Sequence, residues 1–266
     1  MALTLQTFTT SDAAAAALAA DGAARYLGGG TLVVRDANEG DVTFSSYIRA
    51  IDPALSAITV ASGRVTLGAS VTMGRIIADT RFECLEKAAH SVGGPAIRNM
   101  ATVGGNLFAP APYGDLGVAL LALDADVEIG GASVPLEQFL KERDTAHARS
   151  VVRSISFSLP VAGAFRFIKI SRIKPKGVSV ITIAAVIEES DGVIKSARIA
   201  YGCMADRPIR ATAVETALAG KPRTADGISE ALAVASEGTD PITDAIASAW
   251  YRTQVLPVHL GRLLLA

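Results

Sequence analysis

Cysteine and histidine are scarce in this sequence, and their scarcity excludes several kinds of centre. The 266 residues include only two cysteines, Cys84 and Cys203, and three histidines. An iron–sulfur cluster is usually held by more thiolates than this chain has. The spacings C-x-x-C and H-x-x-x-H, which are typical of zinc sites, do not occur. The sequence therefore predicts neither a metal ion nor a cluster, and we expect two buried or half-buried thiols.

An excess of charge of one sign and a long apolar run are also lacking. The chain has 25 Lys and Arg against 26 Asp and Glu, scattered along its length, so it has no field that would attract nucleic acid. Residues 13–20 are apolar but fall short of the roughly 18 residues that a membrane span needs. Residues 1–5 lack the basic segment of a secretory signal peptide. We expect a cytoplasmic protein with no nucleic-acid partner and no membrane span.

Half of the residues are apolar, which is enough for two or three small domains with their own cores. The pattern predicts an α+β fold in three parts, which are residues 1–52, 53–160 and 161–266. The first is expected to be a β-α-β unit and the second to contain two hairpins. The last is expected to be a three-stranded antiparallel sheet followed by helices. Predicted strands of the last part are 165–172, 178–187 and 193–201, and predicted helices of the chain include 11–20, 32–39, 83–92, 116–123, 209–218, 226–236 and 242–250.

Two glycine-rich stretches indicate a binding site. The first runs from an apolar segment through three glycines to a threonine that we expect to cap a short helix. It contains Tyr26, Leu27, Gly28, Gly29, Gly30, Thr31, Leu32 and Val33. A strand, a glycine turn and a helix N-terminus together are suited to a phosphate group. The stretch is neither a G-x-G-x-x-G nor a Walker motif.

The second stretch runs from Asn99 to Asp115. It contains Thr102, Val103, Gly104, Gly105, Asn106 and, nine residues later, Asp115. Adjacent glycines let backbone N–H groups approach an anion, and the aspartate can accept bonds from a diol or a ring N–H. Either stretch alone would be explained as a tight turn. Together they favour a ligand with a pyrophosphate at one end and sugar or ring donors at the other.

These residues carry a resemblance to a known family. Gly28-Gly29-Gly30-Thr31 resembles the A-G-G-T-D-L motif of the FAD-binding medium subunits of the molybdenum hydroxylases, which include the flavin subunits of xanthine, carbon monoxide and nicotinate dehydrogenases. Residues 97–106 with Asp115 are similar to the second motif, I-R-N-x-x-T-I-G-G-N…D. Two departures are Leu32, where the family has Asp, and residues 172–177, which lack the acid of an Arg-Arg-x-x-Asp segment.

The resemblance implies a PCMH-type two-part FAD-binding domain, in residues 1–52 and 53–160, followed by a C-terminal flavoprotein domain. It implies FAD as cofactor, bound by the residues of both stretches and by three further positions, Val92, Val152 and Lys169. Lys174 and Lys176 are further cations that could reach the cofactor. Because the redox chemistry belongs to the flavin, no catalytic side chain is expected.

The resemblance further implies an oxidoreductase subunit that works with partners. These would be a [2Fe-2S] small subunit and a molybdopterin-binding large subunit, assembled as a dimer of heterotrimers, with NAD, oxygen or a quinone as electron acceptor. Substrate oxidation would take place on the large subunit. Two alternatives remain open, a self-contained flavin oxidase or reductase of the same fold and a binding module that has lost FAD.

Overall fold

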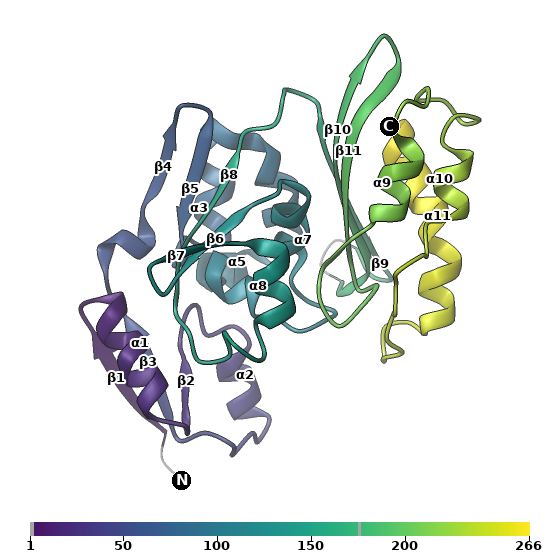
Figure 1. Cartoon of the computed structure of the whole chain (residues 1–266). Helices are drawn as coiled ribbons and strands as arrows, with labels where there is room; N and C mark the ends of the chain where they lie inside the picture. The colour runs from purple at the N-terminus through teal and green to yellow at the C-terminus, as the bar shows by residue number, and fades with distance from the viewer. Residues whose placement is uncertain (1–2, 175–176) are drawn as a thin grey trace.

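The computed structural model describes residues 3–174 and 177–266, and its strands form three separate sheets. Figure 1 shows them in chain order, with the N-terminal sheet at the bottom, the central sheet above it and the C-terminal sheet beside the central one. Lys176 lies outside the described residues, so the prediction that it could reach the cofactor remains a prediction.

The N-terminal sheet is parallel, with the strand order β1-β3-β2. Its elements are β1 (Thr4–Phe8), α1 (Ser11–Ala20), β2 (Ala24–Tyr26), α2 (Val33–Asn38) and β3 (Ser46–Ala50). The predicted helix 11–20 is confirmed, and Thr10 caps it, since the Thr10 hydroxyl accepts from the Ala13 N–H at 3.2 Å. Thr31 was wrongly expected to cap α2, because that helix begins one residue later and Leu32 occupies the cap position.

The central sheet has five antiparallel strands in the order β4-β5-β8-β6-β7. Its strands are β4 (Ile58–Ala61), β5 (Arg64–Gly68), β6 (Asp126–Ile129), β7 (Ala132–Pro135) and β8 (Val152–Ser158). The two predicted hairpins are confirmed and are formed by β4–β5 and β6–β7. Helical segments of this part are η1 (Pro53–Ser56), α3 (Met73–Ala78), η2 (Thr80–Leu85), α4 (Glu86–Ser91), α5 (Pro95–Met100), α6 (Val103–Leu107), α7 (Asp115–Ala122) and α8 (Leu136–Glu142).

The predicted single helix 83–92 is wrong at its start. Residues up to Leu85 belong to the 3-10 segment η2, and only Glu86–Ser91 is α-helical. Phe82 has φ −149° and ψ 68°, which is not helical, and its ring is buried. Burial of this ring and of Leu85 thus sets the backbone here more strongly than the helical spacing of the apolar residues.

The C-terminal sheet contains the three predicted long strands and a short fourth one. They are β9 (Phe165–Ser171), β10 (Ser179–Ser190), β11 (Val193–Gly202) and β12 (Ile209–Arg210), in the order β12-β11-β10-β9. The predicted helix 209–218 begins only at Thr212, as α9 (Thr212–Leu218), because Ile209 and Arg210 pair with β11. The predicted helix 226–236 is shorter, as α10 (Ser229–Ala233).

The prediction of a helix at 242–250 is wrong, because the long helix α11 spans Ala249–Leu265. The Asp244 carboxylate accepts from the N–H groups of Ile246 and Ala247, both at 2.9 Å. An aspartate that bonds the backbone two and three residues onward favours a turn over a helix. The helix starts only where the Ser248 hydroxyl caps it, by accepting from the Tyr251 N–H at 3.1 Å.

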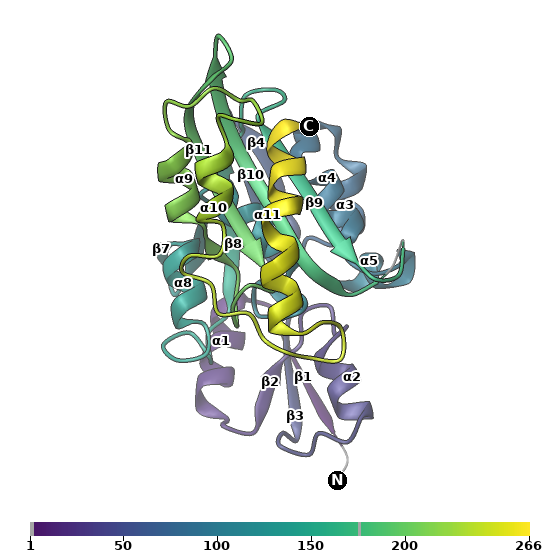
Figure 2. The same ribbon diagram turned by 90° about the vertical axis from the view of Figure 1, so that its right-hand side faces the viewer.

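Residues 179–187 of β10 are buried on both faces of the strand, because the C-terminal sheet lies between two helical layers. Figures 1 and 2 show α9, α10 and α11 on one face of this sheet, and α7 packs against β10 and β11 on the other. Ile181 and Ile183 point into the cluster formed with α9–α11, while Ala184 and Val186 point into the cluster shared with the central sheet. The β-branched run that predicted this strand is therefore explained by burial on two sides. Among residues 3–174 and 177–266, no helix has both the length and the apolar character to cross a membrane.

Arg252 joins α11 to β10 in the interior. Its side chain is completely buried and donates to the carbonyl oxygen of Val180 and, at 2.8 Å, to the carboxylate of Asp244. Desolvation opposes ionisation of Asp244, but backbone hydrogen bonds and Arg252 lower its pKa overall.

Replacing this arginine should therefore be costly. Removing one partner of a buried ion pair typically destabilises a protein by about 3–5 kcal/mol, so we expect Arg252→Ala to lower the free energy of unfolding by about that amount. Urea denaturation followed by circular dichroism measures it. Arg262→Ala, at an exposed position of the same helix, is the control and should change stability by less than about 0.5 kcal/mol. An equal effect of the two substitutions would contradict the role given to Arg252.

Candidate functional site

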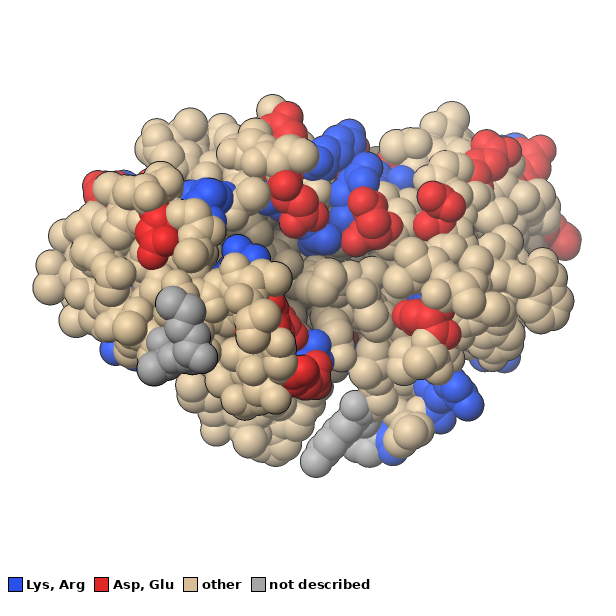
Figure 3. All heavy atoms as spheres, turned by 90° about the horizontal axis from the view of Figure 1, so that it is seen from below, with Lys and Arg blue, Asp and Glu red and all other residues tan. Residues whose placement is uncertain are grey.

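A cavity of about 550 Å³ lies where the three parts of the chain meet. Its lining includes Phe44 from the N-terminal part, Asn106 from the central part, and Lys169 and Val178 from the C-terminal part. Figure 3 shows the lower face of the molecule, with acidic and basic side chains interspersed along its middle. A volume of this size is typical of a site for a large organic ligand.

The first glycine stretch provides a row of free backbone donors. The Leu27 N–H bonds to the Ile48 carbonyl at 2.8 Å and fixes the stretch to β3. The five N–H groups of residues 28–32 have no acceptor among the residues that the structure describes. Gly30 has φ +73°, a left-handed conformation that glycine adopts without strain. Successive free N–H groups on a turn of this kind form a concave site for an anion.

The second glycine stretch differs, because the N–H groups of residues 103–106 are used internally. The N–H groups of Val103 and Gly104 donate to the carbonyls of Val71 and Ala69, at 2.9 and 2.8 Å. The Gly105 N–H donates to the Thr102 hydroxyl at 3.2 Å, so Thr102 caps the short helix α6. The expected role of these N–H groups as phosphate donors is therefore not supported by the hydrogen bonding, and this stretch offers mainly side chains and a close-packed surface.

The two stretches are in direct contact. A Cβ placed on Gly29 would lie 1.8 Å from the carbonyl oxygen of Met100, and one on Gly28 would lie 3.0 Å from the hydroxyl oxygen of Thr102. Gly104 is needed for a different contact, since its Cβ would lie 2.9 Å from the Cβ of Ala69. The absence of side chains at Gly28 and Gly29 thus allows the two stretches to form one wall of the cavity.

Asp115 and Lys169 form an ion pair at the C-terminal side of the cavity. The Lys169 Nζ lies 2.9 Å from the Asp115 Oδ2 and also donates to the Ser91 carbonyl oxygen at 2.8 Å. The two side chains are only 14% and 8% exposed. Asp115 Oδ1 accepts from the hydroxyls of Ser179, at 2.7 Å, and Thr182. A carboxylate has about four lone-pair positions, so roughly one remains for a ligand.

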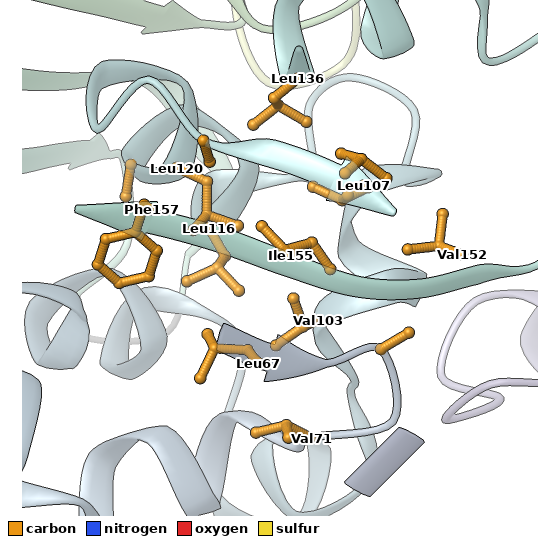
Figure 4. Packing of buried hydrophobic residues seen from close by; sticks show 14 of the residues in the cluster. Leu67, Val71, Val103, Leu107, Leu116, Leu120, Leu136, Val152, Ile155 and Phe157 are labelled. Carbon is orange, nitrogen blue, oxygen red and sulfur yellow. The ribbon is translucent and has the colours of Figure 1, made fainter. Parts of the chain in front are cut away.

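Most of the residues predicted from the sequence line this one cavity. They are Tyr26, Gly28, Gly29, Gly30, Thr31, Leu32, Val33, Val92, Thr102, Gly104, Gly105, Asn106, Asp115, Val152 and Lys169. Val103 instead points into the central core with Leu67 and Ile155 (Figure 4). The side chain of Leu27 lies against Gly30.

Several residues that line the cavity were not predicted from the sequence. The Arg35 guanidinium donates to the Tyr113 hydroxyl at 2.9 Å and lies 5.2 Å from its ring centroid, which connects α2 to the loop before α7. Arg149 lines the cavity and donates to carbonyl oxygens at the end of α1, including that of Leu18 at 3.0 Å. Ser179 lies at the start of a β-branched strand. None of these belongs to a short motif, so only the fold brings them to the site.

Residues 2–160 match the model of the FAD binding domain in molybdopterin dehydrogenase, and residues 166–266 match the model of the CO dehydrogenase flavoprotein C-terminal domain. The chain belongs to this FAD-binding family. FAD is its cofactor.

Named relatives agree with the family model. The chain is 30% identical over 181 residues to the nicotinate dehydrogenase FAD-subunit of Eubacterium barkeri, covering 62% of this chain and 61% of that one. It is 25% identical over 187 residues to the glyceraldehyde dehydrogenase medium chain of Sulfolobus acidocaldarius, covering 68% and 66%. The matches thus span somewhat less than two thirds of the length of these relatives.

Solved structures share the whole fold of this FAD-binding chain. Carbon monoxide dehydrogenase from Hydrogenophaga pseudoflava superposes with a TM-score of 0.90 at 22% identity, covering 99% of this chain and 96% of that one. Quinoline 2-oxidoreductase from Pseudomonas putida 86 gives a TM-score of 0.89 at 25% identity, with 100% and 96% coverage. At such low identity the first of these likenesses supports the fold only.

The residues present fit FAD. The five free N–H groups of residues 28–32 suit a diphosphate, the cavity volume is in the range of sites for large organic ligands, and Asp115 and Lys169 provide polar partners elsewhere in the lining. Burial raises the pKa of the Tyr26 hydroxyl, which also lines the cavity, so this phenol is neutral at physiological pH.

The contact of Gly29 with the second stretch can be tested by adding one methyl group. Gly29→Ala places a Cβ 1.8 Å from the Met100 oxygen, far inside the van der Waals contact distance of the two atoms, so the two stretches must separate. Overpacking of this kind typically costs about 1–3 kcal/mol, and we expect FAD binding to weaken about tenfold or more. Flavin fluorescence titration measures the Kd.

The matched control is Gly22→Ala, at a glycine whose Cβ would meet nothing within 4 Å. It should bind FAD as the wild-type chain does. Wild-type affinity in Gly29→Ala would show that the two stretches need not approach so closely.

The two thiols should be unreactive in the native protein. Burial raises the pKa of Cys203 to about 12, with a further contribution from the negative charge of Asp115, and burial raises the pKa of Cys84 to about 11. Because only thiolates react with iodoacetamide, alkylation at about pH 8 should be slow in the native chain and fast in urea, where the pKa returns to about 8.5. Mass spectrometry of the alkylated chain measures both. Rapid labelling of native Cys203 would contradict its buried position.

Proposed function

We propose that this chain is the electron-transferring flavoprotein subunit of a molybdenum-cofactor hydroxylase or dehydrogenase. In this proposal a [2Fe-2S] small subunit supplies electrons and a molybdopterin-binding large subunit oxidises the substrate. FAD supplies the redox chemistry, by accepting electrons and delivering them to NAD, oxygen or a quinone. The observation that carries the proposal is the row of five free N–H groups, closed against the second glycine stretch at the cavity wall.

The proposed roles of the residues follow from their positions. Residues 28–32 would hold the diphosphate through their N–H groups, and Thr102 and Asn106 would border it. Asn106 is fixed, since its Oδ1 accepts from the Gly117 N–H at 3.0 Å, so its amide nitrogen is left to donate. Asp115 and Lys169 would contact the isoalloxazine end. Residues 1–52 and 53–160 would thus share the cofactor, and residues 161–266 would close its flavin end.

The need for partner subunits is supported by the chemistry that the described residues lack. No group of three or more His, Cys, Asp or Glu side chains suited to a metal occurs among residues 3–174 and 177–266. The cavity residues include one buried carboxylate, Asp115, and it is already paired with Lys169. We therefore assign substrate oxidation to another chain, and we expect the dimer of heterotrimers that the family resemblance implies.

Purification from the native host tests this proposal. The chain should carry one non-covalent FAD, which is released into solution by acid precipitation. It should also elute with two further chains that contain [2Fe-2S] clusters and molybdopterin. Absorption spectra of the supernatant and pellet, and mass spectrometry of the complex, are the measurements.

Other outcomes identify the alternatives. Flavin that stays on the precipitated polypeptide would indicate a self-contained oxidase with covalent cofactor. A chain that elutes alone and colourless, and takes up no added FAD, would indicate a binding module that has lost FAD.

A further inference from the structure

The Asp115 carboxylate links the C-terminal sheet to the cavity. Asp115 is the first residue of α7, in the central part of the chain. Its three side-chain partners, Lys169, Ser179 and Thr182, all lie on β9 and β10 of the C-terminal sheet. The carboxylate therefore joins two parts of the fold that meet at the cofactor cavity.

The two hydroxyls bind one carboxylate oxygen and the ammonium group binds the other. Ser179 and Thr182 donate to Oδ1, whereas Lys169 bonds Oδ2. Ser179 and Thr182 are completely buried, and their hydroxyl oxygens also lie 3.2 Å apart. Thr182 is not among the residues that line the cavity, so any effect it has on a ligand must pass through its hydrogen-bonded neighbours Asp115 and Ser179.

We propose that Ser179 and Thr182 are positioning residues for the flavin end of the site: by binding Asp115 Oδ1 they neutralise part of its charge and keep Oδ2 directed at Lys169. This inference rests on the proposed function, in which Lys169 faces the isoalloxazine. Hydrogen bonds donated to a carboxylate stabilise its charged form and disperse its negative charge. The ammonium of Lys169 then acts on the cavity with less opposition from its own counterion.

The direction of the effect follows from charge. Without the hydroxyls, the negative charge of Asp115 is less neutralised and the cavity becomes more negative. Reduced FAD carries more negative charge than oxidised FAD at about neutral pH. The affinity of the site for reduced FAD therefore falls more than its affinity for oxidised FAD. A tenfold loss in the preference for reduced over oxidised FAD corresponds to a midpoint potential about 30 mV lower for this two-electron couple.

The experiment compares Thr182→Val, which keeps the shape of the side chain and removes the hydroxyl, with Thr182→Ser, which keeps the hydroxyl. Ser196→Ala is the matched control, because Ser196 donates to the Glu188 carboxylate at 2.9 Å on the exposed part of the same sheet. The full chain is titrated with FAD and, separately, with ADP, which contains the diphosphate but no flavin. The midpoint potential of bound FAD is measured spectroelectrochemically at about pH 8.

We expect Thr182→Val to weaken FAD binding severalfold, leave ADP binding unchanged and lower the midpoint potential by roughly 30 mV, a tenfold change in preference. Thr182→Ser and Ser196→Ala should match the wild-type chain. An unchanged or raised potential in a folded Thr182→Val chain overturns the inference, and so does an equal loss of ADP affinity. If Thr182→Val does not fold, Ser179→Ala is measured in the same way and decides by the same outcomes. Failure of the wild-type chain itself to bind FAD would overturn the proposed function instead.

Discussion

The close approach of Gly29 to the Met100 carbonyl is the contact on which the site depends. It brings a turn from the N-terminal part against a loop from the central part, with no room for even one methyl group between them. The turn has free N–H groups, whereas the loop satisfies its own donors through Thr102 and the carbonyls of Ala69 and Val71. One stretch thus provides the donors and the other provides a rigid wall. Sequence motifs with two glycine clusters suggest two equivalent binding loops, but here their roles are different.

Much of the site was predictable because glycine and its neighbours have strong local preferences. Gly28, Gly29 and Gly30 stand out in any reading of the chain, and so do Gly104 and Gly105. What could not be predicted was the use of each N–H group, since that depends on which carbonyls the fold brings near. Ser179 and Thr182 were hidden in a β-branched run that is fully explained as a strand. Their role appears only once β10 lies beside the start of α7.

The fold was predicted best where periodicity and turn residues agreed. The hairpins of the central sheet and the three long strands of the C-terminal sheet are of this kind. The errors occurred where another contact competed for the backbone. Asp244 binds two successive N–H groups and delays the last helix, and Ile209 pairs with a neighbouring strand where the apolar spacing favoured a helix. These contacts depend on tertiary structure or on local capping, which hydrophobic spacing does not encode.

The unpaired N–H groups of residues 28–32 link the stability of the chain in a cell to its cofactor. Water must solvate these donors until a diphosphate replaces the water. A ligand that binds only the native state stabilises that state by mass action. At a free ligand concentration about 100 times the Kd, the stabilisation amounts to about 2.7 kcal/mol. Newly made chains in a flavin-starved cell would thus unfold more often and be degraded sooner, so that vitamin supply would regulate the abundance of the subunit as well as its redox activity.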